Sequence, residues 1–197
     1  MGLRRKPEPV PGRVGVLLVN TGTPDAPTPR AVRRYLARFL MDRRIRPMNA
    51  LGWWLILHVG ILPKRGVASA EKYAAIWTDE GSPLAVTQAR LARGLDEWYR
   101  AEGADVVVRQ AMSYGQPTLP AALRELRAAG CARVVVLPLY PQSAFSTTGA
   151  ASDGVERALR RIRWSVPCEV VPDYHDDPVY VRAIAASIVN AGYDSST

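Results

Sequence analysis

The sequence predicts a single α/β domain of the Rossmann-like or flavodoxin-like kind, in which helices cover a parallel sheet of four strands. Three observations predict it. Short apolar runs typical of fully buried strands recur along the chain. Segments with apolar residues at helical spacing separate these runs. The chain has 197 residues, of which 48% are hydrophobic, and this suffices for one core.

Four runs are predicted as strands. Residues 14–19 (VGVLLV) are continuously apolar, which is typical of a strand that is buried on both faces. Residues 106–112 are partly polar, and residues 133–139 (RVVVLPL) are again mostly apolar. A fourth, short strand is predicted at residues 168–172. No internal repeat connects these segments, so the sheet is expected to belong to one domain.

Helices are predicted between the strands from apolar residues three and four positions apart. One of them has a clear start, because Ser82 is suited to the N-cap and Pro83 to the first helical position. Another ends at Gly130. The predicted helices are residues 30–41, 68–77, 84–101, 117–129, 150–162 and 178–190.

The charge and the cysteine content limit the function classes. The chain has 26 Lys+Arg and 18 Asp+Glu residues, a formal net charge of +8. A basic protein suits nucleic acid, anionic lipid or an acidic small molecule, although a solvated basic face is an equal alternative. Two cysteines exclude a disulfide scaffold and a four-cysteine metal site. The basic N-terminus lacks the apolar run of a signal peptide, so a cytoplasmic protein is expected.

The segment Met48–Leu62 comes nearest to a membrane span but is too short to be one. It contains Trp53 and Trp54, and cations flank it, among them Lys64 and Arg65. This pattern is typical of a helix at an interface, with its rings in lipid and its cations on phosphate headgroups. We therefore expect peripheral contact with the inner face of a membrane, the alternative being a buried core helix.

Most of the distinctive residues lie in loops that follow the predicted strands. These loops contain NTGTPD, SYGQP, YPQSAFSTTG and PDYHDDP. In parallel sheets, ligands bind at the carboxyl ends of the strands. We therefore expect Thr21, Tyr114 and Ser146 to gather at one edge of the sheet. The hydroxyl-rich third loop, which precedes a helix, suits an anion, and plain N-capping by Thr148 or Ser146 is the alternative.

Several common chemistries lack their motifs. Walker, dinucleotide-binding and nucleophile-elbow patterns are absent, which argues against NAD and hydrolase chemistry. The two histidines are His58, in the apolar segment, and His175, in the DYHDD run. That run could hold a hard cation, but carboxylates before a helix are more often caps, so no metal site is assigned.

Four segments together resemble the ferrochelatases, with the bacterial type the nearest: VGVLLVNTGTPDAPTPRAVRRYLARFLMDRRI, EKYAAIWTDEGSPLAV, MSYGQPTL and VVVLPLYPQSAFSTTGAASD. They occur in the order of that family over about residues 13–190. Ferrochelatase inserts ferrous iron into protoporphyrin, and its fold is two similar α/β halves around a porphyrin cleft. The resemblance covers the first half only. It implies a basic tail at residues 1–12, the domain at 13–192 and a polar tail at 193–197.

The resemblance also implies roles for individual residues. The residues that match porphyrin-binding positions of the family are Thr21, Lys72, Tyr73, Ser82, Tyr114 and Ser146. Relatives bring an apolar lip to the membrane, and the residues that match this lip are Trp53, Trp54, Lys64 and Arg65. Some relatives bind an iron–sulfur cluster through a cysteine where this chain has Phe145, so no cluster and no other resident cofactor is expected. Ferrous iron would be a substrate, the porphyrin the partner, and nucleic acid is not expected.

The family places its catalytic His in a motif S-[AFY]-H-[GS]-[IL]-P and a catalytic Glu beyond it. Neither motif occurs in this sequence, so no catalytic or metal-ligating residue is carried over. The expectation is a ferrochelatase-like chain that is inactive alone, either a fragment or a chain completed by a second one. The alternative is a non-catalytic half-domain that binds porphyrin or docks on a membrane.

Overall fold

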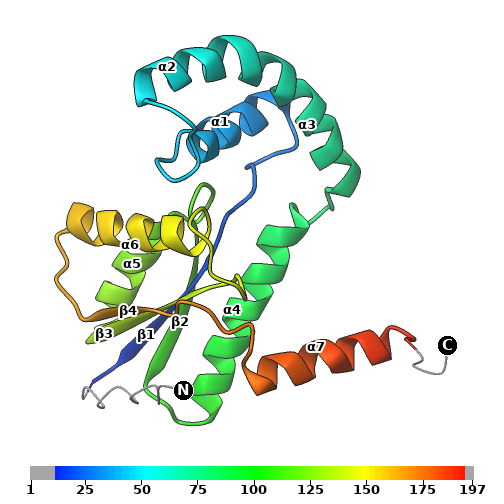
Figure 1. The fold of residues 1–197 in the computed structure, drawn as a ribbon. Coiled ribbons are helices and arrows are strands. Elements are labelled where there is room, and N and C mark those ends of the chain that lie inside the picture. The colour runs from blue at the N-terminus through cyan, green and yellow to red at the C-terminus, as the bar shows by residue number, and fades with distance from the viewer. Residues whose placement is uncertain (1–11, 194–197) are drawn as a thin grey trace.

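The computed structural model describes residues 12–193 and has the predicted α/β fold. Four strands form one parallel sheet in the order β2-β1-β3-β4 (Figure 1). Their bounds are β1, Val14–Asn20, β2, Val106–Met112, β3, Arg133–Pro138, and β4, Cys168–Val170. The four-stranded parallel sheet is thus confirmed. The predicted tails lie outside the described residues, apart from residues 12 and 193.

Strand β4 is two residues shorter than the predicted 168–172. The N–H of Val171 still donates to the Val136 carbonyl at 2.9 Å. The next bond of this ladder would need the N–H of residue 138 in β3, and that residue is Pro138, so the ladder cannot continue. The apolar pattern of the sequence does not show where β4 ends, because the end is set by a missing backbone N–H donor and not by a change in hydrophobicity.

Helices cover both faces of the sheet. Helix α4 (Pro83–Ala101) lies on one face, and α5 (Leu119–Ala128) and α6 (Thr148–Ile162) lie on the other (Figure 1). Leu17 and Leu18, neighbours in β1, are both fully buried but belong to different apolar clusters. Successive side chains of a strand point to opposite faces, so β1 supplies both layers of the core.

A helical arm, residues 29–76, lies beyond the carboxyl ends of the strands (Figure 1). It consists of α1 (Pro29–Leu40), α2 (Ala50–Leu55), the π-helical turn η1 (Ile56–Ile61) and α3 (Leu62–Ile76). The last three run on without a break. Helix α3 therefore begins six residues before the predicted 68–77, and Met48–Leu62 is mostly α2 and η1.

The π turn explains why the helix passes through Pro63. A proline cannot donate to the carbonyl four residues back, and its ring crowds that carbonyl. Just before Pro63, the N–H of Leu62 donates to the carbonyl of Leu57, five residues back. This i to i−5 bond widens the helix. The wider turn thus accommodates Pro63 within a continuous helix.

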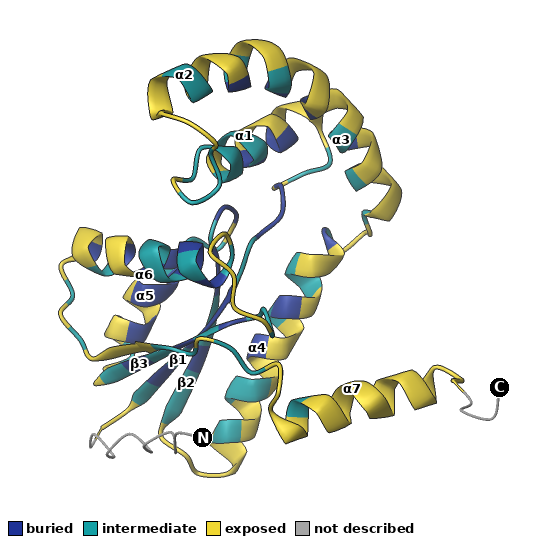
Figure 2. Cartoon of the chain, in the orientation of Figure 1, coloured by how far each residue is buried: buried dark blue, intermediate teal, exposed yellow. Residues whose placement is uncertain are grey.

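Helix α7 (Pro178–Asn190) is at the predicted position and begins at Asp177. The Asp177 carboxylate accepts hydrogen bonds from the N–H groups of Val179, at 2.8 Å, and Tyr180, at 3.3 Å. None of the residues of α7 is buried in the described part of the chain (Figure 2). The expected capping role of an aspartate in the DYHDD run is therefore confirmed for Asp177.

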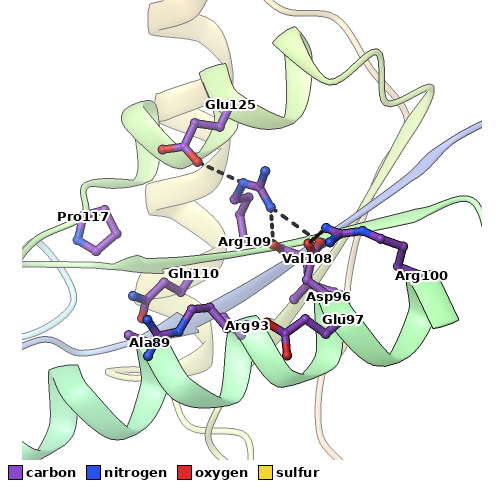
Figure 3. Close-up of a pocket in the computed structure, with 11 residues that line it drawn as sticks. Ala89, Arg93, Asp96, Glu97, Arg100, Val108, Arg109, Gln110, Pro117 and Glu125 are labelled. Atoms are coloured by element: carbon purple, nitrogen blue, oxygen red, sulfur yellow. Dashed lines mark hydrogen bonds and ion pairs between the residues drawn. The ribbon is translucent and has the colours of Figure 1, made fainter.

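Strand β2 is at the edge of the sheet, and side chains occupy its outer backbone groups (Figure 3). The Val108 N–H donates to Asp96 at 2.7 Å, and the Val108 carbonyl accepts from Arg109 at 2.7 Å. Farther along, the Met112 N–H donates to the Pro117 carbonyl at 2.8 Å. A cavity of about 470 Å³ lies beside this edge, between α4 and α5.

Candidate functional site

Loops that follow three neighbouring strands meet at Thr21. The Thr21 hydroxyl is 2.6 Å from the hydroxyl of Tyr140, which lies just after β3. The N–H of Tyr114, just after β2, donates to the Thr21 carbonyl at 3.0 Å. The structure therefore brings Thr21 and Tyr114 together, as predicted. Ser146 belongs to the loop after β3 at the same edge, where it is exposed.

Two glycines let the first two loops touch. A Cβ atom on Gly22 would lie 2.9 Å from the Gly115 nitrogen, and one on Gly115 would lie 2.9 Å from the Thr23 carbonyl oxygen. Real Cβ atoms do not come so close to backbone, and Gly22 also has φ +112°. The glycines of NTGTPD and SYGQP therefore allow the backbones of the two loops to lie in direct contact.

A row of aromatic rings connects the helical arm with this edge. Tyr114 packs edge-on against Phe39 of α1, with ring centroids 5.2 Å apart. The contacts continue through Tyr35 to Tyr73 and Trp77, with centroids between 6.2 and 6.5 Å apart. The Tyr35 hydroxyl donates to the Gly22 carbonyl at 3.0 Å. Tyr73, a predicted site residue of α3, is thus joined to the Thr21 loop through α1.

The tyrosines of this row are neutral hydrogen-bonding groups. Burial raises the pKa of Tyr35, and burial together with the Asp42 carboxylate raises the pKa of Tyr114. Burial also raises the pKa of Tyr140, against the opposing effect of its bond with Thr21. These phenols stay protonated at neutral pH, so they can donate or accept hydrogen bonds but do not act as bases.

Ser82 is buried and lines a cavity of about 340 Å³ together with Thr23 and Trp77. It occupies the N-cap of α4 as predicted, but its side chain makes no capping bond. Two acids line the same cavity, and each has an arginine partner: Glu80 with Arg90 at 2.6 Å, and Asp25 with Arg34 at 3.6 Å. The cavity is large enough for a carboxylate arm but not for a macrocycle.

The loop before α6 is held by an arginine that follows α1. Arg44 forms a two-bond ion pair with Asp153 of α6, at 2.7 and 2.9 Å, and its guanidinium lies 4.3 Å from the centre of the Phe145 ring. The N-cap of α6 is Thr147, without a side-chain bond. The alternative interpretation of this loop, N-capping by Thr148 or Ser146, is therefore wrong, because the helix begins two residues before the predicted 150.

The predicted cations and tryptophans of the lip differ in exposure. Lys64, Arg65 and Lys72 are exposed on α3. Trp54 is 47% exposed and stacks on His58 with centroids 4.6 Å apart. Trp53 instead donates from its indole nitrogen to the Leu40 carbonyl at 2.7 Å, so this ring fixes α2 against the end of α1.

Three side chains after β4 are close enough for one cation. The ligand atoms of Asp173, His175 and Asp176 lie within 4.8 Å of one another. The Nδ1 atom of His175 is 3.6 Å from an Asp173 oxygen. His175 and Asp176 are exposed, and exposed carboxylates in such a loop are common without a metal.

A match to a family model decides the family. A family model described as ferrochelatase matches residues 13–196, nearly the whole chain. The chain belongs to the ferrochelatase family. The predicted family is thereby confirmed, and with it a chelatase-type function and a place in porphyrin and haem biosynthesis. Among the described residues, no helix is both long and apolar enough to cross a membrane.

Three residues of the site were missed from the sequence of this ferrochelatase-family chain. Tyr140 contacts Thr21 across 119 positions, and Arg44 contacts Asp153 across 109 positions. Tyr35 fits the helical spacing of α1, and that spacing predicts a helix without indicating a site. The only early signal was for Tyr140, because it directly follows a predicted buried strand.

Proposed function

We propose that this chain provides one wall of a porphyrin-binding cleft for the insertion of ferrous iron into protoporphyrin IX. The observation that carries the proposal is the meeting of the Thr21, Tyr114 and Tyr140 loops beneath the helical arm. This arrangement offers hydroxyls and aromatic rings at the sheet edge where ligands of parallel sheets bind. Family membership supports the reaction class.

The chemistry of a porphyrin fits these groups. Its disc is flat and apolar, so it packs well against rings such as Tyr73 and Tyr114. Its propionates are anions and need cations or hydrogen-bond donors. The exposed Lys72 and the cavity of Ser82 lie near opposite ends of the segment 72–82, which borders the aromatic row. Lys72 and Ser82 are therefore our proposed propionate contacts.

Iron insertion also requires groups that accept the two pyrrole protons. The tyrosines at the site stay protonated at neutral pH, so they do not perform this step. The family's histidine motif is not found in the 197 residues. We infer that this chain binds and orients the porphyrin, and that the proton acceptors are supplied by residues outside this sequence.

The test is a fluorescence titration of protoporphyrin IX with the full chain and its variants. We expect Lys72→Gln and Ser82→Ala each to weaken binding about twofold to fivefold, which is the size of a partly exposed polar contact. Arg93→Gln is the matched control, because it removes an exposed cation of α4 that does not border the site. Equal affinities for all four proteins would refute the assignment.

A second arm adds ferrous iron under reducing, anaerobic conditions. We expect no porphyrin metalation above the rate without protein, because the tyrosines at the site stay protonated and the family's histidine motif does not occur in the 197 residues. Catalytic turnover that elutes with the chain in gel filtration would contradict this part of the proposal. His175 with Asp176 would then be the first pair to replace, because with Asp173 they form the group of potential metal ligands found among the described residues.

A second candidate function is membrane docking by the helical arm. Leu51, Leu55 and Val59 are 81%, 57% and 70% exposed, and Trp54 lies among them. The cations Lys64 and Arg65 follow on α3 and suit anionic headgroups. We propose that this surface contacts anionic lipid.

Co-sedimentation with vesicles tests the docking surface. We expect binding to vesicles that contain an anionic phospholipid, weaker binding to neutral ones, and at least a threefold loss for the Leu51→Ser and Val59→Ser double variant. Val179→Ser with Val189→Ser in α7 is the matched control, because those side chains are 67% and 61% exposed. Equal losses in both variants would refute docking by the arm.

A further inference from the structure

A cavity of about 580 Å³ lies between α5 and α6, as its lining residues show. The six proposed porphyrin contacts are not part of its lining. The residues that line it are Met112, Ser113, Thr118, Leu119, Pro120, Arg124, Gly154, Arg157, Ala158 and Arg161. It therefore combines an apolar floor, two hydroxyls and three guanidinium groups.

Its charge distinguishes it from the cavity beside β2. That cavity is lined by Arg93, Arg100 and Arg109 but also by three acids, and two of the arginines pair with them. Among the described residues that line the α5–α6 cavity, the charged side chains are all arginines. The field inside it is therefore positive, and the one acid paired with these arginines in the described chain is Asp42, at 3.7 Å from Arg157.

The three arginines that line the cavity make fewer or weaker hydrogen bonds and ion pairs than the other arginines of α5 and α6. Arg127 of α5 donates to the Ile162 carbonyl at 3.1 Å, and Arg160 of α6 pairs with Glu156. In the described part of the chain, Arg124 and Arg161 make no hydrogen bond or ion pair. Their donors are available to a ligand.

The third guanidinium, that of Arg157, has a weak partner. It is 3.7 Å from the Asp42 carboxylate, which already accepts the Arg44 N–H at 2.8 Å. At 3.7 Å the contact is an ion pair without a good hydrogen bond. Arg157 can therefore turn its donors toward the cavity without leaving Asp42 unbonded.

The backbone contributes little to this site. Helix α5 begins at the cavity, but its second residue, Pro120, has no N–H. The N–H of Ala121 is already bonded to Thr118 at 3.0 Å. The binding energy must therefore come mainly from the arginines, with Ser113 and Thr118 as hydroxyl donors.

We propose that this cavity binds a small, multiply charged oxyanion, such as a diphosphate group or a tricarboxylate. Planar guanidinium groups bind either chemistry with paired hydrogen bonds. Three cations from two helices match a ligand with about three negative charges. The volume lies in the range of small-molecule sites and exceeds the need of a single orthophosphate. This inference does not depend on the proposed porphyrin site.

Isothermal titration of the full chain with pyrophosphate, citrate and orthophosphate tests the proposal. We expect pyrophosphate or citrate to bind at least tenfold more tightly than orthophosphate, and the stronger of the two identifies the ligand class. Arg124→Gln and Arg161→Gln should each weaken that binding about fivefold to tenfold. Arg160→Gln is the matched control, since it removes the same charge from the same helix at a residue outside the lining.

The site is supported if Arg124→Gln and Arg161→Gln lose binding while Arg160→Gln changes the affinity less than twofold. Equal losses in all three variants would show only a general effect of net charge and would overturn it. Absence of binding below millimolar concentration would also overturn it. Pyrophosphate that displaces bound protoporphyrin would show one shared site and would refute a separate one. Circular dichroism checks that each variant is folded.

Discussion

The helices on the two faces of the sheet differ from the helical arm and α7 in what they bury. Helices α5 and α6 place their apolar faces on the sheet, where Leu123 and Leu126 are fully buried. In the arm, Leu51 and Val59 are 81% and 70% exposed, and α7 has no buried residue (Figure 2). Apolar side chains therefore maintain the fold on the sheet, whereas in α7 and on the outside of the arm they are available for contacts, although the arm also buries Val32 and Leu57.

The largest expected difference between the regions comes from truncating a leucine in each. Leu123→Ala should lower the free energy of unfolding by about 2–5 kcal/mol, because it leaves a cavity between α5 and the sheet. Leu51→Ala should change it by less than about 0.5 kcal/mol. Urea unfolding followed by circular dichroism measures both. Similar losses would mean that the arm is part of the core.

A second pair of variants compares two helical glycines. A Cβ on Gly154 would lie 2.8 Å from the Leu119 side chain, whereas one on Gly94 of α4 would meet nothing within 4 Å. At Gly154 the overpacking against the end of Leu119 should cost about 1–3 kcal/mol and the helical preference of alanine should offset about 0.5–1 kcal/mol of it, so Gly154→Ala should be less stable than Gly94→Ala. Gly94→Ala should stabilise the chain by about 0.5–1 kcal/mol. The sharpest contradiction would be the reverse order of unfolding midpoints.

The ion pair that joins the start of the arm to α6 should make stability depend on pH. The hydrogen bond with Arg44 lowers the pKa of Asp153 below its usual value. Since the carboxylate is favoured in the folded state, its contribution is present above about pH 4 and is lost as the pH falls through the lowered pKa. Asp153→Asn should lower the melting temperature at pH 7 by roughly 2–4 °C.

The same melting experiment at about pH 3 provides the check. There, the unfolded chain binds a proton at Asp153, whose ordinary pKa is about 3.9, so the difference between wild type and Asp153→Asn should shrink. Glu156→Gln is a suitable control, because Glu156 forms an exposed ion pair within α6. An unchanged difference between pH 7 and pH 3 would show that Asp153 acts through packing instead of charge.

The smallest effect is expected in α7. Ile188 is 48% exposed, so Ile188→Ser should leave the free energy of unfolding within about 0.5 kcal/mol of the wild type. The measurement is again urea unfolding of the full chain. A loss above about 1 kcal/mol would show that α7 packs against something in solution, and the difference between the two regions would then be confined to the arm.

The sequence predicted the elements whose periodicity is regular and whose ends are marked by ordinary signals. Strand β2 and helix α7 have the predicted bounds, because apolar spacing and Pro178 define them locally. The start of α3 was wrong because a π turn carries the helix through Pro63. A wider turn leaves no pattern of period 3.6, so hydrophobic spacing cannot reveal it.

Only part of the candidate site was predicted from the sequence, because only that part follows from the local pattern of strands and loops. The rule that ligands bind at the carboxyl ends of parallel strands placed Thr21 and Tyr114 at one edge, where they contact each other. The bond between Thr21 and Tyr140 and the pairing of Arg44 with Asp153 depend on residues more than 100 positions apart. Such contacts follow from tertiary packing, for which one sequence gives no local signal.

The occupied edge of β2 has a consequence for self-association. An open edge strand is a template on which another chain can add a strand, and this is the usual first step toward β-aggregates. Here a joining strand would first have to displace Asp96 and Arg109 from the Val108 backbone. It would also have to place its own side chains beside these charges. The sheet therefore cannot grow into a continuous sheet between copies from this side without breaking existing bonds.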